Sequence, residues 1–330
     1  MKRLAFDWTL WLKIALAAGA LGYLVHVVEP GAIAEAAAGA HVGWIAAAAA
    51  LLPLNLALQS IVWYLLLQRV APGVRRRAAV GSVLSGHTLG LVTPANAGEF
   101  VGRAFYVPGT DRWEVSAAVL VQRLVEMTAS IDVGAAALFY YLHVFAPEPI
   151  SFWKGLAWSG AGLAVIMTGF ALRPGLAYRV VARVVRRRQV LARVDFLQRL
   201  PSVSATAILG LCFAGYAIYS TQFYFLLRAF APGADVLSGY LGIALVYFVK
   251  FIIPAVTFLD LGIREGAAVY FLGGLGFAEA AALNASLLLF TTNLLLPALA
   301  GLPLVFRLRF RDERAGRTPR PARPDASNRA

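Results

Sequence analysis

SGHTLGLVTPANAGEFVGRAFYV, residues 85–107, is the stretch that decides how this chain folds. It is apolar enough to lie in a bilayer, yet it carries ionisable side chains and helix breakers. Pro94 removes a backbone donor and disfavours helix at Thr93, so we predict a helical hairpin broken near residues 93–98. Broken backbone at membrane depth is tolerated only against protein or water. The stretch is therefore either the lining of a pathway or a breakpoint for close packing, and its charges favour a pathway.

The composition indicates a membrane protein. Of the 330 residues, 60% are hydrophobic and 14% are charged, and the mean hydropathy is +0.70. These values are typical of a polytopic helical membrane protein. All but four of the 30 basic residues are arginines, gathered largely in blocks beside apolar stretches. The net charge of +13 therefore reflects membrane topology rather than nucleic-acid binding.

Metal and disulfide chemistry have little support in the sequence. The single cysteine, Cys212, lies in an apolar run, which excludes a disulfide within the chain. The four histidines, at positions 26, 41, 87 and 143, do not have metal-ligand spacing. We therefore predict no metal, no cofactor and no catalytic residue.

Apolar stretches predict the membrane topology. Six full spans are expected, at about residues 8–28, 41–68, 114–145, 152–172, 203–227 and 278–306. The first span resembles a signal peptide, but its length and the spans that follow favour a retained helix.

Blocks of arginine predict the orientation. Residues 173–199 hold eight arginines and one acidic residue, and residues 307–329 hold eight more arginines. The positive-inside rule places these segments and the N-terminus in the cytoplasm, with residues 146–150 and 231–235 outside. This parity requires residues 78–107 to enter and leave the membrane on the same side.

We expect one membrane domain over residues 1–310 and a disordered basic tail over residues 311–330. The linker at residues 173–200 is expected to be partly an amphipathic helix on the cytoplasmic surface. Its arginines either meet anionic lipid or are simply solvated.

Two segments of the chain resemble each other. YLLLQRVAPG at residues 64–73 and YFLLRAFAPG at residues 224–233 share six identities in ten, at an offset of 160. The same offset carries Pro94 onto Pro254, at a second proline-marked break. An unchanged offset at two places favours an internal duplication.

The topology makes the two copies inverted. Pro72 lies at the cytoplasmic end of its span, whereas Pro232 lies at the external end of its own. Residues 41–145 and 203–306 each supply a span, a broken hairpin and a second span, so one re-entrant hairpin enters from each face. Secondary transporters place a substrate site near the midplane between such discontinuous helices.

Charged residues gather where the site is expected. Gln122, Arg123 and Glu126 share one helix face at about mid-bilayer depth. An Arg123–Glu126 pair is expected, and it serves either to fix helix packing or to hold an anionic head group. Asp132 lies away from that face and receives no role.

The second hairpin repeats the pattern with GIREG at residues 262–266. Arg264 and Glu265 lie at a glycine-loosened break, where helix N-termini present unpaired amides. A phosphate suits these features, because Arg103 and Arg264 can donate paired hydrogen bonds to it. The glutamates either neutralise the arginines or serve proton coupling or a zwitterionic head group.

Two motifs resemble a known family. P-x-x-x-G-E-x-x-G-R at residues 94–103 and G-x-R-E at residues 262–265, with QRLVE between them, are similar to the signatures of the lysylphosphatidylglycerol synthase transmembrane, flippase-like family. The resemblance covers about residues 5–308. It implies a module that moves aminoacylated phosphatidylglycerol, lipid-linked sugars or hopanoid-type lipids. Full-length synthases of this kind carry a large soluble transferase domain after the membrane part, whereas here only about twenty residues follow Phe310, so aminoacyl transfer is not expected.

The sequence thus predicts an all-α inner-membrane protein of bacterial type that translocates an anionic or zwitterionic lipid and is not an enzyme. The candidate lipid-binding side chains are Asn96, Glu99, Arg103, Gln122, Arg123, Glu126, Arg264 and Glu265. The candidate break positions are Pro94, Gly98, Gly102, Pro254, Gly262 and Gly266.

Two other functions stay open. One is a non-transporting subunit of a lipid-modifying or glycosyltransferase complex, which makes such an enzyme a candidate partner. The other is a membrane-embedded transferase or hydrolase with Glu99 or Glu126 as base, although no nucleophile or oxyanion site is evident. No phosphate-binding G-x-x-x-x-G-K-[ST] loop is present, so energy is expected from a proton gradient or from substrate supply. The oligomeric state is left open.

Overall fold

The computed structural model describes residues 19, 22–93, 96–107, 109–145, 151–185, 187–253 and 262–315, with side chains up to residue 306. Every regular element in these ranges is a helix. Both Pro94 and Pro254 lie outside the described residues, as does most of the first expected span.

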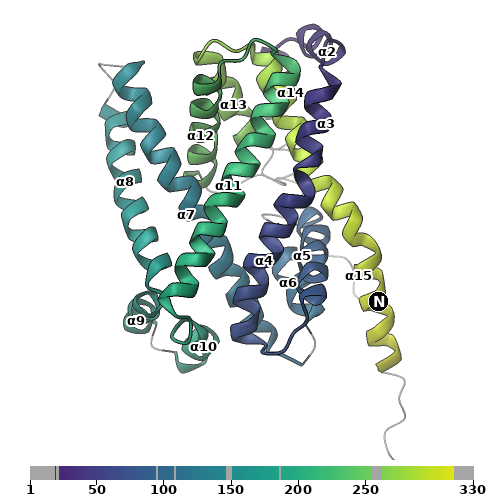
Figure 1. The fold of residues 1–330 in the computed structure, drawn as a ribbon, viewed down its shortest axis with the longest axis vertical. Coiled ribbons are helices and arrows are strands. Elements are labelled where there is room, and N and C mark those ends of the chain that lie inside the picture. Colours follow the sequence, from purple (N-terminus) through teal and green to yellow (C-terminus); the bar gives the residue numbers. More distant parts are fainter. Residues whose placement is uncertain are drawn as a thin grey trace, which may run out of the picture.

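The first half of the bundle runs from α2 to α8 (Figure 1). The helices are α2 (Pro30–Ala38), α3 (Val42–Ala50), α4 (Leu52–Val70), α5 (Arg76–Leu91), α6 (Gly98–Tyr106), α7 (Arg112–Val144) and α8 (Ser151–Leu172).

The second half runs from α9 to α15. Its helices are α9 (Pro174–Val184), α10 (Arg188–Arg193), the 3-10 turn η2 (Asp195–Leu197), α11 (Ser202–Phe230), α12 (Val236–Ile252), α13 (Ile263–Gly274), α14 (Glu279–Phe290), the π-helical η4 (Thr291–Leu295) and α15 (Leu296–Ala315). Because α15 continues to Ala315, helix extends into the segment expected as tail.

Four stretches in the described ranges are long and apolar enough to cross a membrane, so the chain is a multi-pass helical membrane protein. They are Val42–Val70, Ser151–Leu172, Ser202–Phe230 and Glu279–Phe306. The 33-residue α7 also runs from one end of the bundle to the other (Figure 1), but it carries more charge than these four.

Two of these stretches are not regular α-helices. The first divides at Leu51, where Pro53 occupies the opening turn of α4 and has no amide to continue the ladder. The last contains the π-helix η4, a distortion often found at functional sites. Both irregularities carry an asparagine, Asn55 or Asn293, and the two side chains are hydrogen-bonded at 2.9 Å.

Between the long helices the chain forms two helical hairpins. In Figure 1, α5 and α6 pack together in the lower half, and α12 and α13 pack together in the upper half. Gly102 allows close packing in the first hairpin, because a Cβ there would lie 2.6 Å from the carbonyl oxygen of Ser85. In the second, Gly262 has a φ of +101°, which favours glycine, and it is the N-cap residue of α13.

Gly98 and Gly266 differ in what their backbones meet. A Cβ at Gly98 would collide with the carbonyl of Leu89, and the Gly98 amide donates to Thr93 Oγ1 at 2.6 Å. Gly266 lies inside α13, where an added Cβ meets no atom within 4 Å.

The helices α3 and α4 run antiparallel to α11. At one end of the bundle, Arg69 of α4 donates to Ser204 at the start of α11, at 3.4 Å. At the other end, the amide of His41, before α3, donates to the carbonyl of Ala229 in α11, at 2.9 Å.

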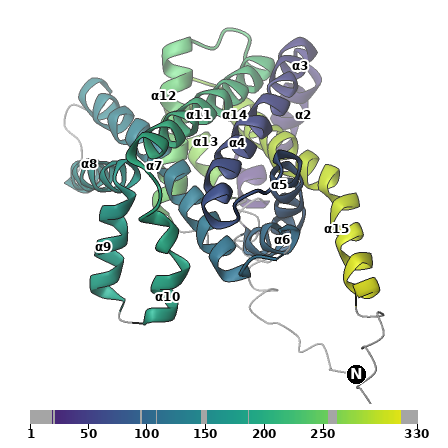
Figure 2. The ribbon, with the colours of Figure 1, turned by 60° about the horizontal axis from the view of Figure 1, so that its bottom comes forward.

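Basic residues lie at one end of the bundle. Figure 2 brings this end forward and shows α9 and α10 projecting side by side from it. Arg199 pairs with Glu114 of α7 at 3.9 Å, and the Arg193 guanidinium lies over the Trp113 ring. At the opposite end, Asp235 caps α12 by accepting from the amide of Ser238 at 2.8 Å, which keeps the pKa of its carboxyl below the usual value.

Candidate functional site

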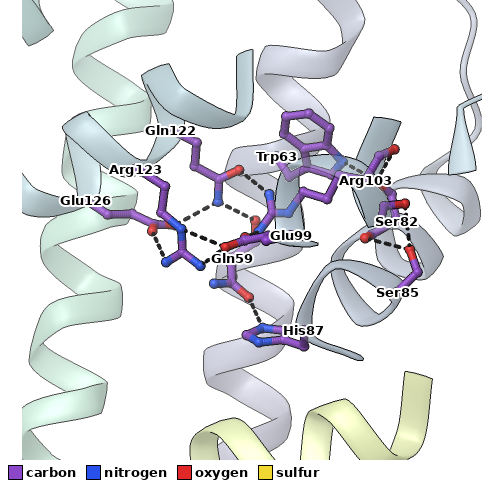
Figure 3. Close-up of polar contacts among 11 residues, drawn as sticks. Gln59, Trp63, Ser82, Ser85, His87, Glu99, Arg103, Gln122, Arg123 and Glu126 are labelled. Atoms are coloured by element: carbon purple, nitrogen blue, oxygen red, sulfur yellow. Dashed lines mark hydrogen bonds and ion pairs between the residues drawn. The ribbon is translucent and has the colours of Figure 1, made fainter. Parts of the chain in front are cut away.

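A network of charged side chains joins the first hairpin to α7 (Figure 3). Glu99, at the start of α6, lies between two arginines and is only 3% exposed. Its Oε1 pairs with Arg103 Nη2 at 2.6 Å, and its Oε2 pairs with both Nε and Nη2 of Arg123. A carboxylate this buried is stable only with such partners.

Gln122 connects the Glu99–Arg103 pair to a second carboxylate, that of Glu126. Its Oε1 accepts from Arg103 Nη1 at 2.7 Å, and its Nε2 donates to Glu126 Oε1 at 2.7 Å. Arg123 Nη1 donates to the other oxygen of Glu126 at 3.2 Å. The expected Arg123–Glu126 pair is therefore present.

Arg103 is enclosed by protein. Its guanidinium lies 5.0 Å from the Trp63 ring centroid, and the residue is 1% exposed. The Trp63 indole in turn donates to Ser82 Oγ, which donates to the Arg103 carbonyl. This arrangement fixes the packing of α6 against α4 and α5.

The second hairpin has its own charged cluster. Arg264 Nη2 pairs with Glu265 Oε1 at 2.5 Å, and Arg264 Nε donates to Ser286 Oγ of α14 at 2.9 Å. The other oxygen of Glu265 accepts from the Gly262 amide at 2.8 Å, which closes the first turn of α13.

A cavity of about 230 Å³ lies between the two clusters. Of the predicted binding residues, Asn96, Arg123, Glu126 and Arg264 line it. Glu99, Gln122 and Glu265 do not line it but are hydrogen-bond or ion-pair partners of these residues. Arg103 lies one step further from it and pairs with Glu99 and Gln122. In the described residues, no group of three or more His, Cys, Asp or Glu side chains is arranged to hold a metal ion.

The sequence matches the family described as "Lysylphosphatidylglycerol synthase TM region" over residues 10–301. The chain belongs to this family. The resemblance inferred from the two motifs is thereby confirmed. No curated protein matches the chain.

In this member of the lysylphosphatidylglycerol synthase TM family, several polar residues line the cavity that the motifs did not indicate. They are Asn55, Gln59, His87, Tyr216, Tyr219, Tyr247, Lys250 and Asn293. Gln59 bonds His87 at 2.8 Å, and the rings of Tyr219 and Tyr247 pack edge to face with centroids 5.2 Å apart.

For four of these residues a signal existed in the sequence. Gln59 and Tyr219 are 160 residues apart, and so are His87 and Tyr247. The offset that relates the two proline-marked breaks therefore also relates these two pairs on the cavity.

Proposed function

We propose that this chain translocates an anionic or zwitterionic lipid across a bacterial inner membrane, with the head group in the cavity between the two hairpins. The observation that carries the proposal is that Arg123 and Arg264, from different halves of the chain, line one cavity. Ionisable side chains inside the membrane-spanning part of a protein usually mark a substrate or ion pathway.

Structural features that recur at the 160-residue offset support this proposal. The helices α4 and α11 end at Val70 and Phe230, and α5 and α12 begin at Arg76 and Val236, so both boundaries differ by 160 residues. The side chains repeat as well. Gln68 donates to the carbonyl of Val74, and Arg228 donates to the carbonyl of Ala234, again at this offset.

Two opposed re-entrant hairpins follow from the same proposal. Since α4 and α11 are antiparallel, a hairpin after each of them enters from a different face. The proposal keeps the six full spans expected from the sequence, which add α7 and the apolar run at residues 8–28 to the four stretches above. The basic end with α9 and α10 then faces the cytoplasm together with both termini.

The cavity suits a phosphate-bearing head group. Arginine has a planar fork of donors that matches phosphate oxygens, and two arginines from opposite halves offset the loss of hydration near the midplane. Neutral side chains such as Asn96 and Tyr216 supply hydrogen bonds to the remainder of the head group. The acyl chains stay in the surrounding hydrocarbon.

Translocation by the purified chain tests the proposal. The protein is reconstituted into liposomes with a trace of fluorescent phosphatidylglycerol, and dithionite reports how much label reaches the outer leaflet. We expect faster exchange than in protein-free liposomes. The variant Arg179→Ala, at an exposed position of α9, keeps the parental rate because Arg179 does not line the cavity.

The transport assay, together with thermal unfolding, also tests the alternative that the chain is a non-transporting subunit. If the folded protein moves no phospholipid, and phosphatidylglycerol does not stabilise it against thermal unfolding, a role as an accessory subunit is favoured instead.

A further inference from the structure

Arg123 holds two carboxylates that differ in exposure. Glu99 is 3% exposed and occupies Nε and Nη2, whereas Glu126 is 24% exposed and occupies Nη1. The Arg123 side chain itself is 36% exposed and lines the cavity. An incoming anion therefore meets Arg123 on the side of Glu126.

Glu99 is the fixed partner of the two. It also pairs with buried Arg103, so its departure would leave Arg103 without a carboxylate and Arg123 with Glu126 alone. Glu126 faces the cavity, and its bonds to Arg123 and Gln122 lie within its own helix, so its release leaves Arg123 still paired with Glu99. Glu126 is thus the carboxylate that a ligand can displace.

A displaced carboxylate beside a phosphate is costly unless it is protonated, because two like charges then share one site near mid-membrane. We propose that a lipid phosphate replaces Glu126 on Arg123 while Glu126 takes up a proton, so that lipid and proton move together. This inference rests on the proposed translocation. The proton comes from the aqueous solution and forms an O–H bond on the Glu126 carboxylate. It returns to water when the phosphate leaves.

The charge balance of this exchange predicts an electroneutral step. A phosphodiester brings one negative charge and the proton cancels one, so the net charge of the cluster does not change. Transport is then driven by a pH difference across the membrane and is independent of the membrane potential.

Other titratable groups border the same cavity and need controls. The titratable and charged groups that line the cavity with Glu126 or contact its partners are His87 on α5, Glu99 and Arg103 on α6, Arg123 on α7, Cys212, Tyr216 and Tyr219 on α11, Tyr247 and Lys250 on α12, and Arg264 on α13. His87 is the rival proton site, so His87→Asn is one control. Asp132→Asn is the matched carboxylate control, because Asp132 is also on α7 but accepts from Thr168 of α8 at 2.6 Å.

Proton uptake on lipid binding tests the exchange without transport. A short-chain phosphatidylglycerol is added to the protein in weakly buffered micelles with a pH-sensitive dye, over about pH 5 to 8. We expect about one proton per bound lipid for the parent and for Asp132→Asn, and the same ratio for the lipid that His87→Asn still binds. Glu126→Gln should bind the lipid with no uptake and unfold at the parental temperature. Binding by the parent without uptake, or uptake that persists in Glu126→Gln, overturns the proposal.

A transport assay separates this inference from the proposed function. In proteoliposomes, a pH difference of one unit should drive a trace lipid to a leaflet ratio of about ten to one, since one unit corresponds to a tenfold equilibrium change. An imposed potassium potential should have no effect. If the lipid exchanges but its leaflet ratio does not depend on the pH difference, the proton coupling is wrong and the proposed translocation is retained. If the folded parent shows no binding and no exchange, both proposals are wrong.

Discussion

Gln122 accepts a hydrogen bond from Arg103, and this contact sets which way its amide group points. Because the oxygen of Gln122 is held by Arg103, its nitrogen is directed to Glu126, at 2.7 Å. A buried residue therefore controls the orientation of a carboxylate on the cavity. The buried pair, Arg103 with Glu99, and the pair on the cavity, Arg123 with Glu126, should therefore respond differently to mutation.

Replacing Gln122 by leucine should destabilise the protein. The change removes one hydrogen bond from Arg103 and one from Glu126, and the loss at buried Arg103 costs about 1–3 kcal/mol. Thermal unfolding in detergent measures the effect, with Gln198→Leu, an exposed position near η2, as the control. An unchanged unfolding temperature for Gln122→Leu would show that the amide does not link the two pairs.

Replacing Arg103 by methionine should affect stability more than translocation. It leaves buried Glu99 with Arg123 alone, and breaking a buried pair costs about 3–5 kcal/mol. Adding Glu99→Gln should recover part of the stability, since the unpaired charge is removed. A double variant that is as stable as the parent but binds no phosphatidylglycerol would instead make Arg103 a direct head-group contact.

Alanine substitutions at two glycines, Gly102 and Gly266, test how closely the helices of each hairpin pack. Gly102→Ala places a methyl group 2.6 Å from the carbonyl oxygen of Ser85, so α5 and α6 must separate, at a cost of about 1–3 kcal/mol. Gly266→Ala has open space in α13 and should be neutral or stabilise by up to about 1 kcal/mol. Thermal unfolding of both variants is the measurement. Equal effects at the two positions would contradict the close approach at Gly102.

Cysteine labelling tests the proposed orientation. In a Cys212→Ala background, a cysteine at Gln189 in α10 should react in intact cells only with a membrane-permeant maleimide. A cysteine at Gly233, at the opposite end of the bundle, should also react with an impermeant one. Labelling of position 189 from outside would reverse the orientation inferred from the arginines.

The sequence predicted those parts of the site that depend on local spacing. Arg123 and Glu126 are three residues apart on one helix, so their pairing follows from helix geometry alone. The close packing at Gly102 and the left-handed backbone at Gly262 also fall at predicted break positions.

Tertiary packing decides the rest. Arg103 was expected on the cavity with Arg123 and Arg264, but α6 packs so that Arg103 lies against Trp63 and only the other two reach the cavity. No local pattern specifies which face of a short helix meets its neighbour. Gln59 and Tyr219 come to the cavity from opposite halves, and only an extension of the 160-residue offset along α4 and α11 would have found them.

The central claim is that Arg123 and Arg264 hold the head group of a lipid in transit. It is tested most directly by translocation of fluorescent phosphatidylglycerol in proteoliposomes with two partner-neutralised variants, Arg123→Ala with Glu126→Gln and Arg264→Ala with Glu265→Gln. Neutralising the partner avoids an unpaired buried carboxylate, so both proteins should fold. We predict that the parent and Arg179→Ala exchange the lipid at the same rate and that both double variants lose at least about tenfold, equivalent to about 1.4 kcal/mol. Well-folded double variants that move the lipid at the parental rate would contradict the claim.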